Sequence, residues 1–351
     1  MRVAVVSFQT SHRTSRQGAA RTETLAQGLA ARGHDVTVFC TQWWHGDDAG
    51  AERVKDGLRF RRVDVAPNPL SSAARLPGQL ARFQPDVVHA TPAPPAVLFA
   101  AKAGATLGRA PLVCDWYGDE PVDGSPLART ATSLPDELLA PSEFVGSRLR
   151  ERGVDDEQLT VLPEYVDLNR VRATEPRADA PDIVAGRRLD ADANLESLFL
   201  GLAELRREEW TAAIVGDGPA REEFEAAAAD LRIDDRVTFL GDVSREERIA
   251  LYRGAQAFVH TARREQFATE LLWALACGCL GIVEYRSESA AHELVERRDR
   301  GFRVTSSEEI AAAIREARDD EHLTVDDALA PFDREQVLSD LLARYRALGA
   351  G

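Results

Sequence analysis

Lysine is almost absent from this chain of 351 residues: Lys55 and Lys102 are lysines, and the other 41 of the 43 basic residues are arginine. Long hydrophobic runs are missing too. The longest uncharged apolar stretch, residues 271–283, has thirteen residues, whereas a helix that crosses a bilayer needs roughly 20. The apolar residues 3–8 are too few for a secretory signal. We therefore expect a cytoplasmic protein without a transmembrane helix.

Cysteine and methionine are also scarce, with four and one respectively. Cys277-Gly278-Cys279 has no second cysteine pair to complete a zinc site, and Cys40 and Cys114 lie in apolar, strand-like runs. We expect buried free thiols, no disulfide framework and a reducing compartment.

Positive charge is in deficit overall, because 58 acidic residues against 43 basic ones give a net charge of −15. An acidic protein repels polyanions, so we expect no nucleic acid partner. Many acidic residues with almost no lysine favour a halophilic, for example haloarchaeal, protein whose surface charge is screened by concentrated salt. A GC-rich genome, which favours arginine and alanine over lysine, is the alternative explanation, and the sequence leaves both open.

The charge is unevenly distributed along the chain. Residues 1–82 carry a balance of +5, and the remaining residues carry −20. The basic residues gather around Arg13, Arg16 and Arg21 and again in residues 53–62. One interpretation is a basic face for an anionic partner such as a phospholipid head group at the membrane. The other is a set of solvated loops beside acidic neighbours.

Short apolar runs alternate with helical patterns along most of the chain, which is typical of a parallel sheet covered by helices on both faces. Residues 172–181 are rich in Pro, Asp and Arg without periodicity, as expected of a segment between domains. A second alternation begins at Ile183. The runs that predict strands are residues 3–8, 36–40, 87–89, 112–114, 137–140 and 159–162, and then 211–215, 237–240, 257–260 and 281–284.

This pattern predicts an α/β protein with two doubly wound, Rossmann-like domains that face each other across a cleft. The predicted domains are residues 1–170 and 182–333, and the amphipathic residues 334–351 are predicted to form a helix that crosses back to the first domain. Ligands of open α/β sheets bind at the carboxyl ends of the strands, so we expect the site in the interdomain cleft.

The most specific stretch lies in the second half. It contains, in order, the turn Gly216-Asp217-Gly218-Pro219, the strand region 235–241, Leu251-Tyr252, and a helix that follows Glu265-Gln266-Phe267 and ends at Ala276-Cys277-Gly278. Together these parts resemble the nucleotide-binding domain of glycosyltransferase family 4, which has the GT-B fold. In the first half, Gly18 and residues 32–38, 85–89 and 162–167 resemble further landmarks of that family. The resemblance covers nearly the whole chain.

The resemblance implies a metal-independent site in which side-chain cations, backbone amides and a helix N-terminus stabilise a nucleoside diphosphate leaving group. The implied catalytic residues are Arg188 at the diphosphate, which the register favours over Arg187, Glu265 at the donor sugar, and Tyr117. Thr269 is expected to cap the helix. The residues expected to bind the donor are Gly18, Arg187, Gly216, Gly218, Leu240, Gln266, Phe267, Ala268, Thr269, Glu270 and Trp273.

Three positions depart from the family pattern. Trp273 replaces the second glutamate of the E-x7-E motif, which usually binds ribose hydroxyls. Asp192-Ala193 stands where the family has a lysine that accompanies the arginine. Tyr117 stands where many relatives have histidine before a glycine. Losing one positioned electrostatic contact costs about 3 kcal/mol of barrier, so these departures bear on whether the chain is active.

Some residues are candidates to replace what is missing. Arg187 beside Arg188 is a candidate second cation, because arginine binds phosphate in a bidentate manner. Glu270 is a candidate for the ribose contact. Trp273 has two interpretations, stacking on a base or sugar or packing in the core, and both stay open.

Two histidines, His89 and His260, end predicted strands, and one hypothesis, left open by the sequence, is that His89 or His260 lines the cleft. Neither has the spacing of a metal site. His292-Glu293 lies where the family often has a glutamate near the donor base or ribose.

The expected function is a retaining, metal-independent glycosyltransferase that needs no cofactor and uses a nucleotide-sugar as substrate. The acceptor is expected on the first domain and to be a glycan, a lipid-linked sugar or an anionic phospholipid. The +5 segment favours peripheral contact with the inner face of the membrane. The alternative is a non-catalytic binding or regulatory protein that kept the GT-B shell, and a third hypothesis is another nucleotide-sugar enzyme such as an epimerase or phosphorylase.

Overall fold

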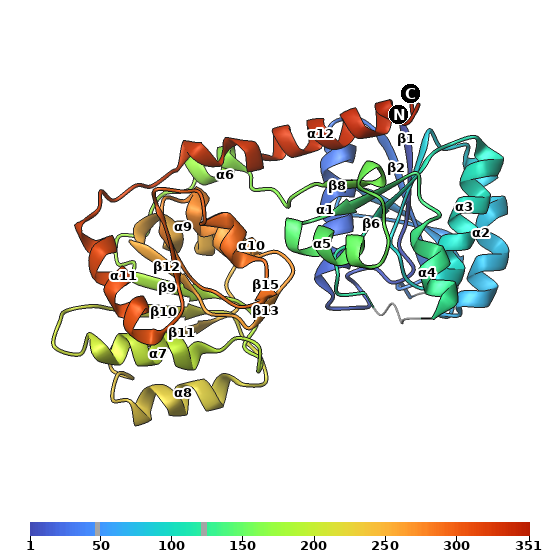
Figure 1. Cartoon of the computed structure of the whole chain (residues 1–351). Helices are drawn as coiled ribbons and strands as arrows, with labels where there is room; N and C mark the ends of the chain where they lie inside the picture. Colours follow the sequence, from blue (N-terminus) through green and yellow to red (C-terminus); the bar gives the residue numbers. More distant parts are fainter. Residues whose placement is uncertain (46–49, 121–124) are drawn as a thin grey trace. The chain divides into compact units, whose positions relative to one another are not determined.

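The computed structural model describes residues 1–45, 50–120 and 125–351 (Figure 1). The chain forms two compact units. Unit 1 consists of Met1–Pro163 together with Glu335–Gly351, and unit 2 is Glu164–Arg334. Each unit is an open, doubly wound α/β domain, which confirms the predicted fold class.

Unit 1 contains an eight-stranded sheet in the order β3-β4-β2-β1-β5-β6-β7-β8. All neighbouring strands are parallel except β3 and β4, which form an antiparallel pair at the edge. The strands are β1 (Arg2–Val6), β2 (Asp35–Thr41), β3 (Glu52–Lys55), β4 (Leu58–Asp64), β5 (Val87–Ala90), β6 (Leu112–Asp115), β7 (Glu137–Ala140) and β8 (Leu159–Val161). The central strands are apolar runs buried along their length, as a parallel sheet covered on both faces requires.

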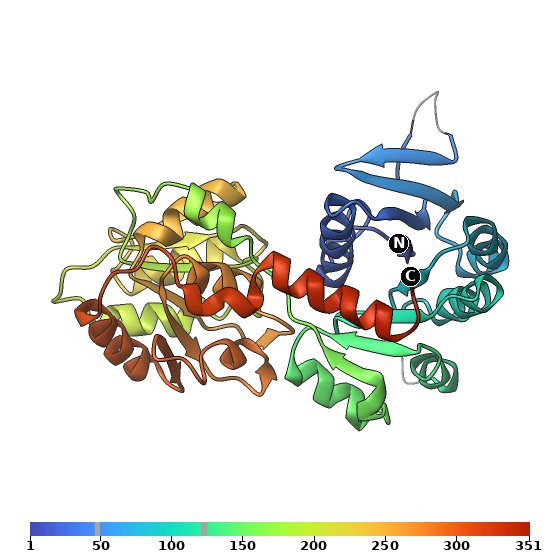
Figure 2. The ribbon, with the colours of Figure 1, turned by 90° about the horizontal axis from the view of Figure 1, so that it is seen from above.

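The helices of unit 1 cover both faces of this sheet. Helices α2 and α3 lie on one face and α1 on the other (Figure 2). The helices are α1 (Gln17–Ala31), α2 (Pro69–Phe83), α3 (Pro95–Gly108), α4 (Pro126–Thr132), α5 (Glu143–Glu151) and the C-terminal α12 (Arg334–Ala347). Helix α2 begins where sequence chemistry predicts, because Asn68 accepts hydrogen bonds from Leu70 N and Ser71 N and Pro69 occupies the first turn.

Helix α12 is fastened to unit 1 by polar contacts that reach into the core. The Tyr345 hydroxyl lies 2.6 Å from His89 Nδ1, and Arg344 Nε donates to Glu137 at 2.5 Å. Tyr345 is fully buried. The two ends of the chain lie close together on this unit (Figures 1 and 2).

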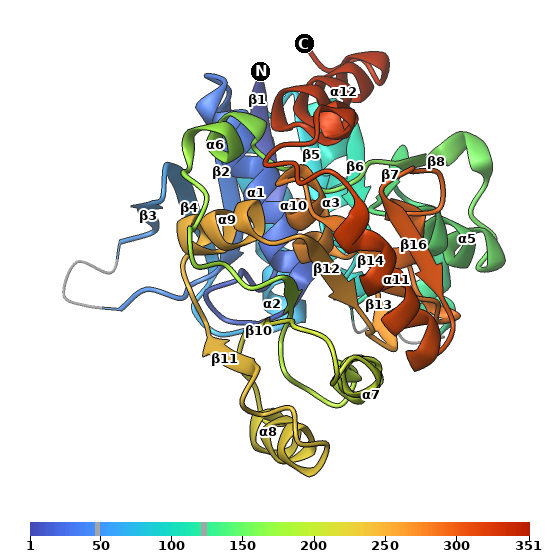
Figure 3. The same ribbon diagram turned by 90° about the vertical axis from the view of Figure 1, so that its left-hand side faces the viewer.

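Unit 2 contains a six-stranded parallel sheet in the order β11-β10-β9-β12-β14-β16 and a small two-stranded sheet, β13-β15. Helices α7, α8 and α11 lie on one face of the larger sheet and α9 and α10 on the other (Figures 1 and 3). The strands are β9 (Ile183–Gly186), β10 (Ala212–Val215), β11 (Val237–Gly241), β12 (Ala257–His260), β13 (Arg264–Glu265), β14 (Leu280–Glu284), β15 (Glu288–Ser289) and β16 (Gly301–Val304). The helices are α6 (Leu168–Ala173), α7 (Leu195–Glu204), α8 (Arg221–Asp230), α9 (Arg245–Gly254), α10 (Thr269–Ala276) and α11 (Ser307–Asp319).

The boundary between the units lies after Pro163, a few residues before the end at 170 that the sequence suggests. The reason is local pairing inside unit 2. Val166 N donates to Phe332 O at 3.0 Å, and Arg334 N donates to Val166 O at 2.8 Å. Asp167 also accepts from Arg334 Nη1 at 2.7 Å. These bonds attach the segment before α6 to the segment before α12.

None of the helices in the described part of the chain is both long enough and apolar enough to span a bilayer.

Candidate functional site

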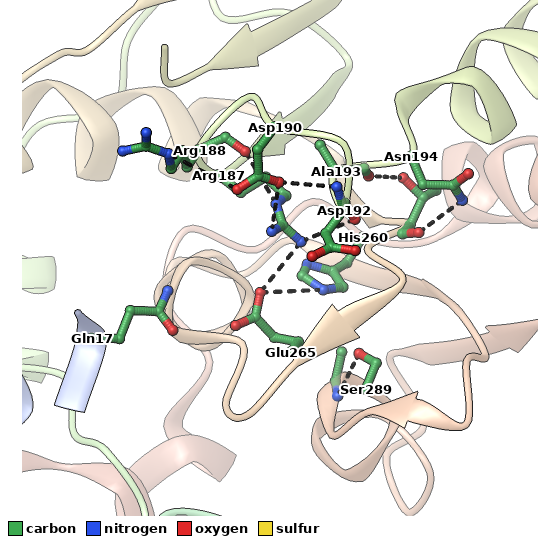
Figure 4. Close-up of polar contacts among 12 residues, drawn as sticks. Gln17, Arg187, Arg188, Asp190, Asp192, Ala193, Asn194, His260, Glu265 and Ser289 are labelled. Carbon is green, nitrogen blue, oxygen red and sulfur yellow. Dashed lines mark hydrogen bonds and ion pairs between the residues drawn. The ribbon is translucent and has the colours of Figure 1, made fainter. Parts of the chain in front are cut away.

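Three polar side chains meet at the carboxyl edge of the sheet in unit 2 (Figure 4). Arg187 follows the last residue of β9, His260 is the last residue of β12, and Glu265 ends β13. Arg187 Nη1 lies 3.6 Å from Glu265 Oε2, and His260 Nε2 lies 3.9 Å from the same oxygen. The carboxyl ends of parallel strands are where open α/β sheets bind ligands.

Arg187 is the arginine of this cluster, and the register that favours Arg188 is wrong about which side chain turns inward. Arg187 is held by long contacts to Asp190 Oδ1 and Asp192 O, both at 3.4 Å. The Arg188 side chain is 63% exposed, its Nε is 3.9 Å from Asp190, and it points away from Glu265 (Figure 4). Successive side chains of an extended segment point to opposite sides, so one position decides which arginine faces the site.

Glu265 is buried, and burial raises its pKa to about 7. Arg187 opposes this rise in pKa, whereas the nearby Glu164 and Asp190 add to it. The backbone at this position is fixed by the short sheet and by Ala290 N, which donates to Glu265 O at 2.8 Å. The carboxyl group is therefore held in place and titrates near neutral pH.

His260 joins Glu265, which the sequence indicates only through its place at a strand end. Burial, with the positive charge of Arg187 as a smaller cause, lowers its pKa to about 3, so its imidazole is neutral at physiological pH. Only 4% of His260 is exposed, and Nε2 has no hydrogen-bond partner among the described residues.

The loop that lacks the family's lysine is built differently. Ala193 belongs to the hydrophobic core, so a lysine there would have to enter it. Asn194 adopts a left-handed conformation with φ of 53°, and its amide donates to Glu284 Oε2 and Thr261 O, both at 2.9 Å. Glu284, a buried carboxylate at the end of β14, also accepts from Arg286 at 2.6 Å. No motif marks Glu284, which is a single acid at the end of an apolar run.

Helix α10 begins one residue earlier than the predicted cap implies. Its N-cap is Ala268, which has no side-chain capping bond. The Thr269 hydroxyl instead donates to Glu164 Oε2 at 2.7 Å, so the expectation that Thr269 caps the helix is wrong. Phe267 and Ala268 are buried, and Gln266 is half-buried.

Glu270 and Trp273 on α10 are engaged within unit 2. Glu270 accepts from Tyr252 at 2.7 Å, from Arg245 at 3.0 Å and lies 2.9 Å from Arg248. Both carboxylate oxygens of Glu270 thus have partners within unit 2. Trp273 is buried, and Arg245 lies over its ring at 4.9 Å. This arrangement supports the interpretation of Trp273 as a core residue.

The glycines of the 216–219 turn have a packing role. A Cβ atom at Gly216, where φ is +118°, would lie 2.0 Å from Arg187 O, and one at Gly218 would lie 2.2 Å from Leu189 O. Only glycine lets this turn approach the loop that carries Arg187. Leu240 is half-exposed on the edge strand β11.

In unit 1, the backbone amide of Gly18 already has an anionic partner. Gly18 N donates to Asp119 Oδ2 at 3.2 Å, and a Cβ atom at Gly18 would lie 2.9 Å from Tyr117 Cβ. Tyr117 is fully buried and donates to Gln17 Oε1 at 3.0 Å. In this structure Gly18 is required for packing, and a donor phosphate would have to displace Asp119 from its amide.

A cavity of about 190 Å³ lies beside this loop. Glu120, which accepts from Tyr117 N at 2.8 Å and Gly118 N at 2.7 Å, is one of its walls. Burial raises the pKa of Glu120 to about 7, and it raises the pKa of Asp119 as well. The lining residues are Phe8, Gln9, Thr14, Arg16, Gly18, Ala19, Thr91, Ala93, Pro94, Pro95, Asp119 and Glu120.

His89 belongs to a buried polar network under α12. Its Nδ1 pairs with Tyr345, and its Nε2 lies 3.9 Å from Asp115 Oδ2. Asp115 accepts from Arg21 Nε at 3.0 Å, and Arg21 also donates to Leu162 O at 2.7 Å. Burial alone would raise the pKa of Asp115, but Arg21 and His89 outweigh it and lower that pKa. We infer that this network stabilises the fold of unit 1.

The basic residues of the first 82 positions are partly paired. Arg61 contacts Glu52 at 2.5 Å, and Arg75 contacts Asp64 at 3.0 Å. Within the described ranges, no group of three or more His, Cys, Asp or Glu side chains has an arrangement that could hold a metal ion.

Comparisons with known proteins agree with this architecture. Residues 18–164 match the family model described as "Glycosyl transferase 4-like domain", and residues 169–328 match "Glycosyl transferases group 1". A GDP-mannose-dependent alpha-(1-6)-phosphatidylinositol monomannoside mannosyltransferase of Mycolicibacterium smegmatis is 28% identical over 301 residues, 77% of each chain. The sulfoquinovosyl transferase SQD2 of Arabidopsis thaliana is 25% identical over 71% of this chain and 53% of its own length.

Two solved structures share the fold over 99% of this chain. The glycosyltransferase of Rickettsia africae ESF-5 aligns with a TM-score of 0.80, 16% identity and 98% of its own chain covered. Anabaena Alr3699/HepE in complex with UDP and glucose aligns with a TM-score of 0.74, 17% identity and 100% of its chain covered.

Proposed function

We propose that unit 2 binds a nucleotide-sugar donor and that unit 1 binds the acceptor. The premise is that this chain belongs, through both of its domains, to the GT-B glycosyltransferases. The observation that carries the proposal is the cluster of Arg187, His260 and Glu265 at the carboxyl edge of unit 2. A cation and a neutral imidazole, each within 4 Å of the same carboxyl group, can bind the charged and the hydroxyl-bearing parts of one ligand.

Arg187 is proposed to stabilise the diphosphate leaving group. As the bond to the anomeric carbon breaks, negative charge grows on the leaving oxygen, and a fixed guanidinium lowers the energy of that state more than that of the bound donor. The proposed reaction is metal-independent and retains the anomeric configuration by front-face attack. No protein nucleophile is required in this mechanism, so Glu265 serves to bind the sugar.

The donor is proposed to be a nucleoside diphosphate sugar. Two observations on similar proteins support this class. One relative is named a GDP-mannose-dependent enzyme, and a solved structure of the same fold contains UDP and glucose. The two bases differ, so the proposal names the diphosphate and the sugar and leaves the base to the binding experiment.

The acceptor is proposed to enter the cavity of unit 1 through a sugar hydroxyl. Asp119 and Glu120 line that cavity together with the single cation Arg16. Carboxyl groups accept hydrogen bonds from hydroxyls and repel phosphate, so the cavity suits the neutral part of a glycan or lipid-linked sugar.

An anionic head group is proposed to bind elsewhere on unit 1, at peripheral contact with a membrane. Val54 on β3 and Leu70 at the start of α2 are exposed, at 69% and 77%. Val54 lies between Arg53 and Lys55, and Leu70 lies within the first 82 residues, which carry a balance of +5. Exposed apolar side chains among basic ones suit the interface of an anionic bilayer.

The experiment measures the binding of UDP-, GDP- and dTDP-hexoses by titration calorimetry, followed by turnover of the donor that binds. Arg187→Ala should lower kcat/KM about 10²- to 10³-fold, as expected for the loss of one positioned electrostatic contact. Arg188→Ala is the matched control and should stay within about twofold, because the Arg188 side chain is exposed and points away.

If no nucleotide-sugar binds at millimolar concentration, the non-catalytic alternative replaces the enzyme. If Arg188→Ala has the larger effect, the donor site has been placed on the wrong side of the loop.

A further inference from the structure

The three polar groups of the unit 2 site are close together without touching. Glu265 Oε2 is 3.6 Å from Arg187 Nη1 and 3.9 Å from His260 Nε2. Both separations exceed the 2.7–3.2 Å of a hydrogen bond. All three residues belong to unit 2 (Figure 4).

His260 is the unexpected member of this group. It is buried at the end of β12, and its Nε2 has no partner among residues 1–45, 50–120 and 125–351. A buried polar atom without a hydrogen bond is unfavourable, and native proteins keep few of them. A ligand atom that supplies the missing bond explains why the imidazole is held there.

The distances from Glu265 Oε2 to the other two side chains fit a single bridging oxygen atom. An oxygen placed about 2.8 Å from both His260 Nε2 and Glu265 Oε2 forms two ordinary hydrogen bonds, because those two atoms are 3.9 Å apart. The same oxygen can approach Arg187 Nη1, which lies 3.6 Å from Glu265 Oε2. A bridging atom therefore satisfies what the direct contacts do not.

The charges of Arg187 and Glu265 select the chemistry of that oxygen. The Glu265 carboxylate repels a phosphate oxygen, and Arg187 repels an ammonium group. A hydroxyl fits both, because it donates to the carboxylate and accepts from an N–H group. A neutral imidazole accepts from the hydroxyl or donates to it, depending on its tautomer.

We propose that His260 Nε2 and Glu265 Oε2 bind one and the same hydroxyl of the transferred sugar, which makes His260 a specificity-determining residue. The inference rests on the proposed function of unit 2. It predicts that the protein prefers donors with a free hydroxyl at one ring carbon and discriminates against donors that are deoxygenated or carry an amino or acylamino group there.

The test uses the nucleotide-hexose that the full-length protein turns over best, together with its monodeoxy analogues at each ring hydroxyl. The proposal expects that one analogue reacts about 10- to 100-fold more slowly with the wild type, because a site built to bind a hydroxyl is left unpaired. With His260→Ala, kcat/KM for the parent donor should fall by a similar factor, whereas kcat/KM for that one analogue should stay nearly unchanged.

Two controls separate a specific contact from a general disturbance. His260→Gln, which places an amide near the position of Nε2, should recover part of the discrimination. His322→Ala, at an exposed histidine of the same unit, should leave the analogue series unchanged. The affinity for the nucleoside diphosphate without sugar should be the same in wild type and His260→Gln, which reports on folding and on the diphosphate contacts.

Two further results would contradict the shared hydroxyl or the proposed function, and they can be told apart. If His260→Ala slows the parent donor and every analogue by the same factor, or if neither His260 variant changes the preference, the shared hydroxyl is refuted although the transferase remains. If the wild type binds no nucleotide-sugar at all, the failure lies in the proposed function.

Discussion

The carboxyl edges of the two sheets carry similar residue types that differ in how they are hydrogen-bonded to one another. In unit 1, hydrogen bonds join Arg21 to Asp115 and His89 Nδ1 to Tyr345, and His89 Nε2 lies 3.9 Å from Asp115. In unit 2, Arg187 and His260 lie 3.6 Å and 3.9 Å from Glu265 Oε2, and His260 Nε2 has no hydrogen-bond partner within the described part of the chain.

The difference distinguishes polar groups that hold a fold together from polar groups that await a ligand. Hydrogen bonds between buried charged and polar groups rigidify their surroundings. A cluster whose members lack hydrogen bonds to one another costs stability until a ligand completes it, which is the usual condition of a binding site. The following variants test this contrast, from the largest expected effect to the smallest.

Breaking the buried network of unit 1 at Arg21 should destabilise that unit severely. Arg21→Ala leaves Asp115 charged and buried, with both side chains only 1% exposed, and removing one partner of a buried pair costs about 3–5 kcal/mol. Hydrogen exchange should show lost protection in β1 and β6, with β9 in unit 2 unaffected. Arg75→Ala, at an arginine whose side chain is 56% exposed, is the control and should cost less than about 1 kcal/mol. Equal effects of the two variants would show that the network is not a structural tie.

Removing the negative charge of Glu265 should stabilise unit 2 above neutral pH. Glu265 has its pKa raised from 4.5 to about 7 in the folded protein. Its contribution to the free energy of unfolding is therefore fully present below about pH 4.5 and is lost as the pH rises through about 7. Glu265→Gln stays neutral, so at pH 8 it should exceed the wild type by up to about 3 kcal/mol.

The measurement is the difference in free energy of unfolding between variant and wild type from pH 5 to pH 9. The lowered pKa of His260 acts in both proteins, below about pH 6.5, and largely cancels. Glu196→Gln, at an exposed glutamate, should show no such trend. A flat difference for Glu265→Gln would mean that the carboxyl group is already satisfied.

Loosening the C-terminal tie should have the smallest effect. Tyr345→Phe removes the hydroxyl that pairs with His89 Nδ1 at 2.6 Å and leaves a buried nitrogen unsatisfied, at a cost of about 1–2 kcal/mol. Faster hydrogen exchange in α12 would report it. Tyr285→Phe, at a partly exposed tyrosine, is the matched control. No change on removing the Tyr345 hydroxyl would indicate that apolar packing alone fastens the helix.

Much of the fold could be predicted from the sequence because apolar runs mark buried parallel strands directly. Residues 257–260 are predicted as a strand and form β12. The hairpin β3–β4 was missed, because all of β3 is exposed and it has no apolar run. An edge strand is defined by its hydrogen-bonded neighbour, which local composition does not reveal.

The site was predictable only in part. Motif order located Glu265, but the choice between Arg187 and Arg188 depends on a single position of backbone direction. Glu284 and Asp119 act through partners distant in the sequence, Asn194 and Gly18 respectively. No pattern within one segment shows such contacts, since they form only when the sheet brings separate loops together.

The return of the last helix to unit 1 sets an order of events during synthesis. Unit 2 is one uninterrupted segment, Glu164–Arg334, whereas unit 1 needs Glu335–Gly351 for completion. On the ribosome, the half that is translated first therefore remains unfinished until residues 335–351 emerge, and the half that is translated later can close before it. A nascent chain that stalls before Tyr345 would expose His89 and the apolar surface under α12 to chaperones.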